Sequence, residues 1–214
     1  MLGGPWPRDY VFGVSYRVAV AASGRGSNLG ALLTRLEAGG PAEVILVISN
    51  RPEASALATA RTNGIPTAVF TQPEDTQAWL AVLSVHRVDL LVLAGYLKLL
   101  PPEVVRAYQG RIINIHPALL PRYGGPGMYG ARVHHAVLQA GEKETGATVH
   151  LVTEQYDQGQ VLAQARLRVR AQDTPESLAE RVLELEHRLL PEAVLAAAAA
   201  GRPVPFPFTE EAPS

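Results

Sequence analysis

Short apolar runs alternate with amphipathic segments along the first half of the chain. Runs rich in β-branched residues are typical of strands, and their alternation with helical patterns indicates βαβ units. The runs predict strands at residues 17–22, 43–48, 67–70, 89–94 and 111–115. The segments between them predict helices at residues 28–38, 54–63, 76–86 and 102–108. We therefore expect an α/β fold with a doubly wound, mainly parallel sheet.

The second half of the chain departs from this alternation. Residues 117–130 contain three Pro and four Gly, and this composition predicts a long loop over a surface or a site. The pattern then predicts a helix at 133–140, strands at 148–152 and 161–169, and a long closing helix at 175–199 capped by Thr174. The last two strands are expected to be antiparallel, because the residues between them are too few for a crossover.

The predicted elements belong to one domain, which we expect at residues 17–203. Residues 1–16 are interpreted as a short N-terminal appendage, because they lack the charged and apolar regions of a signal peptide. The Pro-rich residues 204–214 predict a flexible C-terminal tail.

Composition narrows the class of function. A chain of 214 residues with 47% hydrophobic content can bury a sizeable core, which excludes a disordered chain. The formal net charge of -1 gives no broad cationic face for nucleic acid or an anionic membrane, and it favours a small polar substrate. The absence of Cys excludes thiolate catalysis and zinc-thiolate sites, and it fits a cytoplasmic protein. No apolar run approaches the roughly 20 residues of a membrane span.

A glycine-bearing turn, Ser23-Gly-Arg-Gly-Ser-Asn28, connects the first predicted strand to the first predicted helix. A helix N-terminus there offers free backbone N–H groups and a positive dipole end to an anion. Leu29 stands where a dinucleotide fingerprint needs a third Gly, and the Gly-Lys-Ser/Thr of a P-loop is missing, so NAD and ATP are disfavoured. The turn predicts a phosphate site, and a tight turn without a ligand is the alternative.

Asn114 and His116 lie at the end of a predicted buried strand, and strand alternation sends both side chains to the same side. An amide can donate to a developing oxyanion while an imidazole moves protons, which suits acyl-type chemistry. A strand-end pair satisfied by loop backbone is the alternative.

A second polar cluster contains His150, Glu154 and Asp157, followed by Gly159, which allows a tight backbone. A carboxylate held against His116 would raise the pKa of that imidazole and fix its orientation. Asp157 as an ordinary turn residue is one alternative. A metal site formed by His116, His150 and Asp157 is another, but no compact ligand pattern supports it.

Other polar residues carry less information about function. The pairs His134-His135 and Glu186-His187 are typical of surface or packing positions on helices. Arg166, Arg168 and Arg170 alternate along a strand, which indicates a solvated face.

Taken together, these segments resemble the folate-dependent phosphoribosylglycinamide formyltransferase family. The resemblance extends from about residue 17 to 203 and rests on five segments: Ser23-Gly-Arg-Gly-Ser-Asn28, Val47-Ile-Ser-Asn-Arg51, Leu93-Ala-Gly-Tyr-Leu-Lys98, Asn114-Ile-His-Pro117 with Leu119-Leu-Pro121, and Tyr156-Asp-Gln-Gly159. It implies a Rossmann-like formyltransferase fold. It also implies transfer of a formyl group from 10-formyltetrahydrofolate to the amine of glycinamide ribonucleotide in purine biosynthesis, without a metal.

The resemblance also implies roles for individual residues. Asn114, His116 and Asp157 would carry the chemistry, with Asn114 and protonated His116 stabilising the oxyanion and His116 or a water relaying protons. The substrate phosphate would be held by Gly26, Ser27 and Asn28, and its ribose or glycinamide part by Glu186. The folate would contact Asn114 and a further group of residues, Leu97, Lys98, Leu99, Leu100 and Val105.

The chain departs from the family pattern at Pro126, Gln158 and Gln160, and it has no basic residue between Arg61 and Arg87 that could reach the folate tail. The alternative functions are a 10-formyltetrahydrofolate hydrolase, whose N-terminal regulatory domain is missing, and a catalytically inert nucleotide-binding module. Methionyl-tRNA formylation would require a further C-terminal domain and a basic surface. The sequence leaves a homodimer open.

Overall fold

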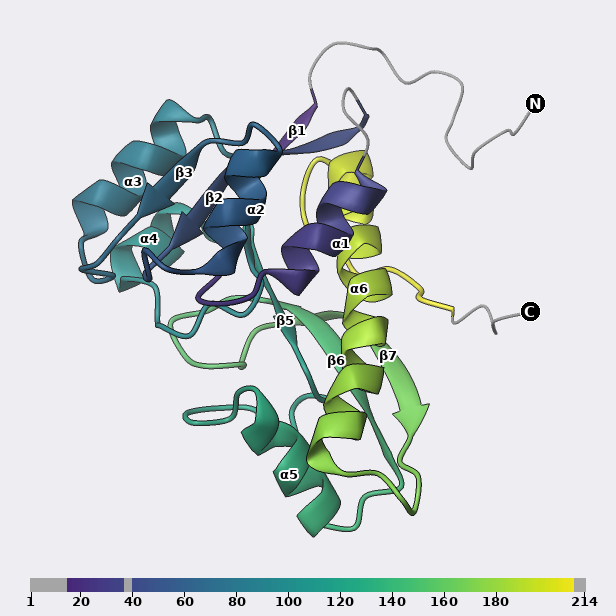
Figure 1. Ribbon diagram of the computed structural model, residues 1–214. Coiled ribbons are helices and arrows are strands. Elements are labelled where there is room, and N and C mark those ends of the chain that lie inside the picture. The colour runs from purple at the N-terminus through teal and green to yellow at the C-terminus, as the bar shows by residue number, and fades with distance from the viewer. Residues whose placement is uncertain (1–14, 37–39, 210–214) are drawn as a thin grey trace.

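Within residues 15–36 and 40–209, which this computed structural model describes, seven strands form one sheet in the order β3-β2-β1-β4-β5-β6-β7 (Figure 1). Strands β1 to β5 pair in parallel, whereas β6 is antiparallel to both β5 and β7. The strands are β1 Tyr16–Ala21, β2 Ala42–Ser49, β3 Thr67–Val69, β4 Leu90–Leu93, β5 Ile112–His116, β6 Glu144–Leu151 and β7 Val161–Arg168. The expected α/β architecture is thus confirmed.

The helices cover both faces of this sheet. They are α1 Ser27–Arg35, α2 Ser55–Thr62, α3 Thr76–Val85, α4 Pro102–Ala107, α5 Ala131–Gln139 and α6 Pro175–Ala200. Helices α1, α2, α5 and α6 share one apolar core with the sheet, and α3 and α4 share the other. Because β1 sends alternate residues into the two cores from Val18 onward, its residues 18–21 are a continuous apolar run. No helix in the described ranges is long and apolar enough to cross a membrane.

The boundaries differ from the predicted ones mainly in the second half of the sheet. Strand β6 begins at Glu144, four residues before the predicted start, because it pairs with β7 along its whole length. The segment Glu144-Thr-Gly-Ala147 lacks the apolar pattern of a strand, so sequence alone did not indicate it. Helix α1 ends at Arg35, and the predicted end at residues 37–38 lies outside the described residues.

Helix α6 starts where its cap predicts. The Thr174 side chain accepts a hydrogen bond from the Ser177 backbone, and the Ser177 side chain accepts one from the Thr174 backbone. This reciprocal capping satisfies two N–H groups at the start of the helix, and Pro175 occupies a position at which an N–H is not needed. The Thr174 cap is therefore confirmed.

The prediction of a flexible tail at 204–214 is wrong for its described part. The Phe206 backbone N–H donates to the Leu162 carbonyl at 3.1 Å, and Phe206 and Phe208 pack against the core that α6 covers. Proline prevents a regular element here, but it does not prevent two aromatic side chains from burying apolar surface. Residues 210–214 lie outside the described residues, as do residues 1–14 of the predicted appendage.

The register of the central strands brings the candidate residues together. Leu93 at the end of β4 pairs with Asn114, Asn114 pairs with His150 across the antiparallel ladder, and His116 pairs with Thr148. Directly opposed residues on neighbouring strands have close Cβ atoms. The side chain of Asn114 therefore meets that of His150 at the edge of the sheet where the parallel strands end.

Replacement by Ala should have opposite effects on stability at two glycines. A Cβ atom on Gly159 would collide with the carbonyl of Leu151, whereas one on Gly30 inside α1 would meet no atom within 4 Å. We expect Gly159→Ala to lower the free energy of unfolding by about 1–3 kcal/mol through this clash. Gly30→Ala should raise it by about 0.5–1 kcal/mol because Ala favours the helix. Urea denaturation measures both, and a Gly159→Ala variant as stable as the wild type would contradict the close approach of this loop to β6.

Candidate active site

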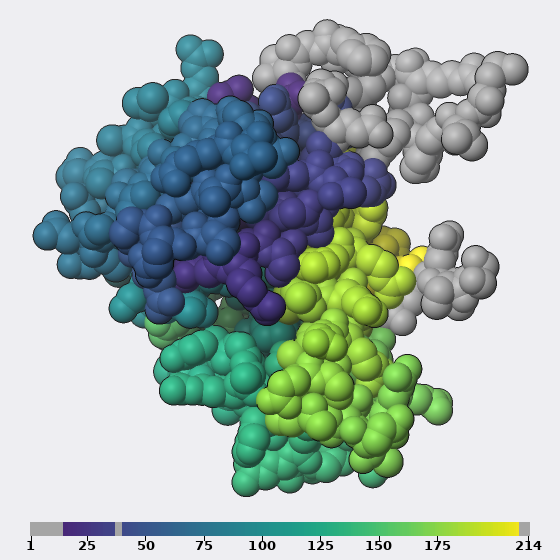
Figure 2. All heavy atoms as spheres, in the orientation of Figure 1, coloured from purple at the N-terminus to yellow at the C-terminus, as the bar shows by residue number. Residues whose placement is uncertain are grey.

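A cleft of about 620 Å³ opens beyond the ends of β1, β4 and β5. It is lined by the turn after β1, the segment 93–100, the end of β5, the loop 125–130, the loop 152–157 and one side of α6. Figure 2 shows the purple N-terminal part, the teal middle part and the yellow-green α6 bordering one another on this face of the molecule. In doubly wound sheets the strand ends near such a change of strand direction are the usual ligand site.

The turn after β1 begins helix α1 as predicted. Gly26 is the residue before the helix and has a φ of 76°, a conformation that favours glycine. A Cβ at Gly26 would also come within 2.7 Å of the Ala56 Cβ. Gly26, Ser27 and Asn28 all line the cleft. The backbone of the turn thus reaches the cleft at a helix N-terminus.

Ser23 is a structural residue that sequence reasoning missed. Its side chain is 2% exposed, donates to Asn50 Oδ1 at 2.6 Å and accepts from the Leu97 backbone N–H at 2.9 Å. Its own N–H donates to the Gly95 carbonyl at 3.0 Å. These bonds join the loops that follow β1, β2 and β4. The loop sequence carried no signal for them beyond a serine at the end of a strand.

Asn28 and Glu186 meet at the floor of the cleft. Asn28 Nδ2 donates to Glu186 Oε2 at 2.6 Å, and both side chains are buried. Burial raises the pKa of Glu186 to about 7, although the Asn28 hydrogen bond acts in the opposite direction. Asn28 Oδ1 has no hydrogen-bond partner among the described residues. The surface alternative expected for Glu186 from its helix context is wrong, because the side chain is buried; its carboxyl lines the cleft.

The segment expected to contact folate borders the cleft. Leu97, Lys98, Leu99 and Leu100 all line it, and Leu97 and Leu99 are 41% and 47% exposed. Val105 does not line the cleft, and its expected contact with the folate stays a prediction. It is buried in the core beneath α3 and α4, because the short helix α4 turns this side chain inward.

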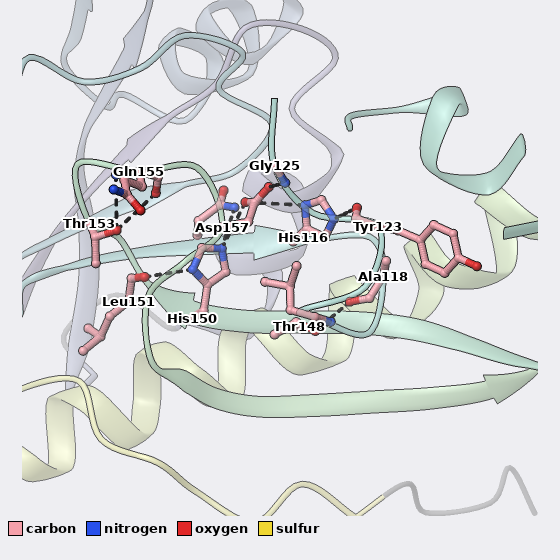
Figure 3. A network of polar contacts seen from close by, with 12 residues as sticks. His116, Ala118, Tyr123, Gly125, Thr148, His150, Leu151, Thr153, Gln155 and Asp157 are labelled. Carbon is pink, nitrogen blue, oxygen red and sulfur yellow. Dashed lines mark hydrogen bonds and ion pairs between the residues drawn. The ribbon is translucent and has the colours of Figure 1, made fainter. Parts of the chain in front are cut away.

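His116 is held by a backbone carbonyl and faces a carboxylate (Figure 3). Its Nε2 atom lies 2.7 Å from the Tyr123 carbonyl, which only accepts, so Nε2 carries a proton. Its Nδ1 atom lies 3.6 Å from Asp157 Oδ1. In the neutral ring Nδ1 is therefore the free lone pair, and a proton added there would face the Asp157 charge.

The expected rise in the pKa of His116 is wrong. Burial is the largest influence on the pKa of this imidazole, and the net pKa is lowered although the Asp157 charge and the Tyr123 hydrogen bond raise it. The nearby His150 also lowers it. Without a ligand the His116 ring is thus neutral at pH 7, and protonation occurs less readily than for a free histidine. Sequence reasoning recognised the carboxylate partner but had no measure of burial.

Asp157 is the common partner of three groups in Figure 3. Its Oδ2 accepts from the Gly125 backbone N–H at 2.8 Å, and its Oδ1 lies 3.4 Å from His150 Nε2 and faces His116. Burial raises the pKa of the Asp157 carboxyl, but the two histidines and the Gly125 hydrogen bond together lower it below its usual range. The carboxyl is therefore ionised at neutral pH.

Two residues around this network have left-handed backbone. Asp157 has a φ of 54° and Tyr123, whose carbonyl holds His116, has a φ of 58°. Non-glycine residues rarely adopt this conformation, and strain of this kind is concentrated at functional sites. A further residue with positive φ, Arg87, lies in a turn away from the cleft.

Glu154 does not lie with His150 and Asp157, the residues with which the sequence analysis grouped it. Its side chain is exposed and accepts from Arg106 at 2.7 Å, and it does not line the cleft. His150 stays in the cluster, with its Nε2 atom 3.0 Å from Asn114 Nδ2 and its Nδ1 atom 2.8 Å from the Leu151 carbonyl. The loop after β6 therefore sends Glu154 outward and Asp157 inward.

His134 is a further cleft residue that sequence reasoning missed. It is 4% exposed and lines the cleft from helix α5, and its Nδ1 atom has no hydrogen-bond partner among the described residues. Burial, together with the His116 charge, lowers the pKa of His134 to about 4. Of the two positions expected for His134, surface or packing, the surface one is wrong, because the side chain is buried. The adjacent His135 is exposed, so the helical position of each ring decides its environment.

The loop between β5 and α5 is anchored beneath the cleft by one buried threonine. Thr148 Oγ1 donates to the Ala118 carbonyl at 2.6 Å and accepts from the Leu120 N–H at 3.1 Å. Gln164 from β7 donates to Thr148 Oγ1 and to the Leu120 carbonyl, each at 3.0 Å. These bonds hold the start of the predicted loop 117–130, which is confirmed as irregular over most of its length.

Among the described residues, no group of three or more His, Asp or Glu side chains has an arrangement that could hold a metal ion. The cleft therefore offers an amide, an imidazole and a carboxylate that meet at one end. It also offers a helix N-terminus and a buried carboxyl of raised pKa at the Asn28 side. This arrangement can stabilise an oxyanion, move a proton and bind an anion.

The sequence matches the formyl transferase family over residues 16–194, and the chain belongs to this family. It is 46% identical over 186 residues to the chloroplastic phosphoribosylglycinamide formyltransferase of Arabidopsis thaliana, covering 83% of this chain and 64% of that protein. It is 37% identical over 186 residues to the phosphoribosylglycinamide formyltransferase of Bacillus subtilis, covering 83% of this chain and 92% of that protein. The chain thus spans less than two thirds of the plant relative and almost the whole length of the bacterial one.

Solved structures share the fold. The crystal structure of phosphoribosylglycinamide formyltransferase from Anaplasma phagocytophilum matches with a TM-score of 0.81 at 40% identity, covering 86% of this chain and 87% of that chain. The enzyme of the same name from Brucella melitensis matches with a TM-score of 0.76 at 43% identity, covering 88% and 96%. The expected formyltransferase fold is confirmed.

The coupling between His116 and Asp157 predicts that replacing Asp157 changes the pKa of the His116 ring. Because the Asp157 charge raises the pKa of His116 against the effect of burial, Asp157→Asn should lower this pKa further below that of free histidine. An NMR titration of the His116 ring measures it, with Glu43→Gln as a control that removes an exposed carboxylate outside the lining of the cleft. An identical His116 titration in wild type and Asp157→Asn would contradict the coupling.

The raised pKa of Glu186 predicts a dependence of stability on pH. In the unfolded chain this carboxyl ionises near its ordinary 4.5, whereas in the fold its pKa is about 7. The folded state thus holds an extra proton between these values, and the stability this contributes is complete below about pH 4.5 and is lost as pH rises through about 7.

Glu186→Gln removes this dependence. The wild type should lose more free energy of unfolding than Glu186→Gln between about pH 5 and about pH 8, as measured by urea denaturation at each pH. Glu192→Gln, at an exposed position on the same helix, serves as the control and should follow the wild type. Parallel pH profiles for the wild type and Glu186→Gln would show that the carboxyl is not perturbed.

Proposed function

We propose that the chain transfers a formyl group from 10-formyltetrahydrofolate to the amine of glycinamide ribonucleotide, a step of purine biosynthesis. The observation that carries this proposal is the meeting of Asn114, His116 and Asp157 at one end of a cleft whose other side is a helix N-terminus. Relatives of the same family with 37% and 46% identity bear the name of this activity, which supports the proposal.

Each part of the cleft matches one part of the two substrates. The backbone at Gly26, Ser27 and Asn28 offers N–H groups to the phosphate of glycinamide ribonucleotide. Glu186, beside Asn28, provides a carboxyl for the ribose or glycinamide part. The exposed side chains of Leu97 and Leu99 supply apolar surface for the folate, and Lys98 lies between them. The two substrates would thus approach each other at Asn114 and His116.

The reaction needs one oxyanion donor and one proton carrier. The substrate amine attacks the formyl carbon, a carbon–nitrogen bond forms, and the formyl oxygen acquires negative charge. An N–H of Asn114 would donate to this oxygen in the tetrahedral intermediate. The bond between the formyl carbon and N10 of the folate then breaks, and the proton released by the amine passes to N10 through His116 or a water.

Burial decides how His116 takes part in proton transfer. The neutral ring of the free enzyme can accept a proton at Nδ1, the nitrogen that faces Asp157 at 3.6 Å. The Asp157 charge would then stabilise the imidazolium that forms, until the proton is passed to the leaving folate nitrogen. His116 therefore acts first as a base and then as an acid, whereas the sequence led us to expect a ring that is already protonated when the oxyanion forms. Cytoplasmic location and a homodimer stay predictions.

Three parallel incubations test the proposed function. The chain is mixed with 10-formyltetrahydrofolate and with glycinamide ribonucleotide, with the same glycinamide riboside lacking its phosphate, or with no acceptor, and released tetrahydrofolate and formylated product are quantified. We expect equal amounts of both products with the ribonucleotide and a kcat/KM at least about tenfold lower with the riboside, because the helix N-terminus then binds no anion. Release of folate without an acceptor would identify a hydrolase, and no release at all would identify an inert binding module.

A further inference from the structure

His150 contacts the candidate oxyanion donor but has no role in the reaction proposed above. It lies on β6 directly opposite Asn114 on β5, and its side chain is 2% exposed. Its Nε2 atom lies 3.0 Å from Asn114 Nδ2, within hydrogen-bond distance. The two side chains therefore form a pair fixed by the register of the sheet.

The two ring nitrogens of His150 have different partners, and these define where its proton lies. Nδ1 is 2.8 Å from the Leu151 carbonyl, which can only accept, so Nδ1 carries a proton. Nε2 faces the Asn114 amide nitrogen, which can only donate, so Nε2 supplies a lone pair. Both contacts are satisfied together only by the neutral ring with its proton on Nδ1. The carbonyl of Leu151 thus selects the tautomer that can accept from Asn114.

We propose that His150 is a positioning residue whose Nε2 accepts one N–H of the Asn114 amide and leaves the second N–H for the formyl oxygen. The inference rests on the proposed function of Asn114 as the oxyanion donor. An amide can rotate to exchange its oxygen and nitrogen, and an oxygen turned toward a developing oxyanion would repel it. A fixed acceptor behind Asn114 prevents this exchange, so the donor is in place before the charge develops.

Because Asp157 is a second partner of His150 Nε2, the protonation state of this nitrogen decides whether it can hold Asn114. The Oδ1 atom of Asp157 lies 3.4 Å from the same Nε2. A proton on Nε2 would direct the ring to this carboxylate and remove the lone pair that holds Asn114. The low pKa of the Asp157 carboxyl includes the effect of a hydrogen bond from His150, which only a protonated Nε2 can donate. With Nε2 unprotonated, His116 at 3.6 Å and the Gly125 N–H are the groups left to favour the Asp157 charge. One nitrogen therefore has two mutually exclusive partners, and the Leu151 carbonyl decides between them through the opposite side of the ring.

A double-mutant cycle separates this role from a general effect on the site. His150→Leu removes the acceptor, and we expect it to lower kcat about tenfold with little change in KM for either substrate. Asn114→Ala alone should lower kcat by about a hundredfold, as for loss of an oxyanion donor. If His150 acts through Asn114, adding His150→Leu to Asn114→Ala should lower kcat by less than about twofold.

A conservative variant and a measurement of folding serve as controls for this cycle. His150→Gln keeps an acceptor oxygen and should retain most of the wild-type kcat, which a merely space-filling role would not predict. Urea denaturation of each variant monitors folding. An equal loss of kcat on adding His150→Leu to the wild type and to Asn114→Ala, or no loss in the wild type, would overturn the proposal.

A second measurement does not depend on activity. Two-bond ¹H–¹⁵N NMR spectra of the ligand-free wild-type protein report which ring nitrogen of His150 carries the proton. We expect a protonated Nδ1 and an unprotonated Nε2 at neutral pH, and this result can be obtained even if the chain does not formylate glycinamide ribonucleotide. A proton on Nε2 would overturn the proposed hydrogen bond, whereas failure of the activity with an unprotonated Nε2 would reject only the proposed function.

Discussion

Strand β6 returns antiparallel along β5 after five parallel strands, with Asn114 opposite His150 and His116 opposite Thr148. This pairing brings a second set of polar side chains to the edge where the parallel strands end. Thr148 anchors the loop after His116, and the loop that follows β6 carries Asp157 back over both rings. A shift of one residue in this register would turn each of these side chains to the other face of the sheet.

Burial and charge act against each other throughout the cleft. Asp157 is ionised because His116, a backbone N–H and, when its Nε2 carries a proton, His150 favour its charged form, although burial disfavours it. His116 and Glu186 show the opposite outcome, since burial dominates for both and each tends toward its neutral form. A neutral imidazole next to a fixed carboxylate can accept a proton during a reaction, which a permanently charged ring cannot do. Burial within the cleft therefore helps to set the protonation states on which the proposed chemistry depends.

The sequence predicts the position of a site residue well when that residue lies at the end of a strand. It predicts the position less well when the orientation of the side chain depends on how the surrounding segments pack. The apolar runs placed Asn114 and His116 at the end of a buried strand, and the glycine pattern placed Gly26 at the start of α1. Glu154 was grouped with His150 and Asp157 but does not line the cleft, and Val105 is buried in the core, because their orientation depends on how a loop and a short helix turn.

Burial was the other property that sequence could not supply. His134 and His135 are neighbours of identical type, yet only His134 faces the cleft, because α5 packs one side against the rest of the molecule. The pKa of His116 depends on the same kind of information. The tail was also misjudged, because proline content indicates an irregular backbone but does not say whether Phe206 can reach the core.

The central claim is that one cleft holds both substrates with the reacting atoms between Asn114 and His116. A crystal structure of the chain with glycinamide ribonucleotide and a folate analogue that cannot transfer its formyl group tests this most directly. The account predicts the phosphate at the backbone of residues 26–28, the analogue against Leu97 and Leu99, and the amine facing the formyl-equivalent carbon within hydrogen-bond reach of Asn114 and His116. A phosphate bound elsewhere, or an amine remote from Asn114, would contradict it.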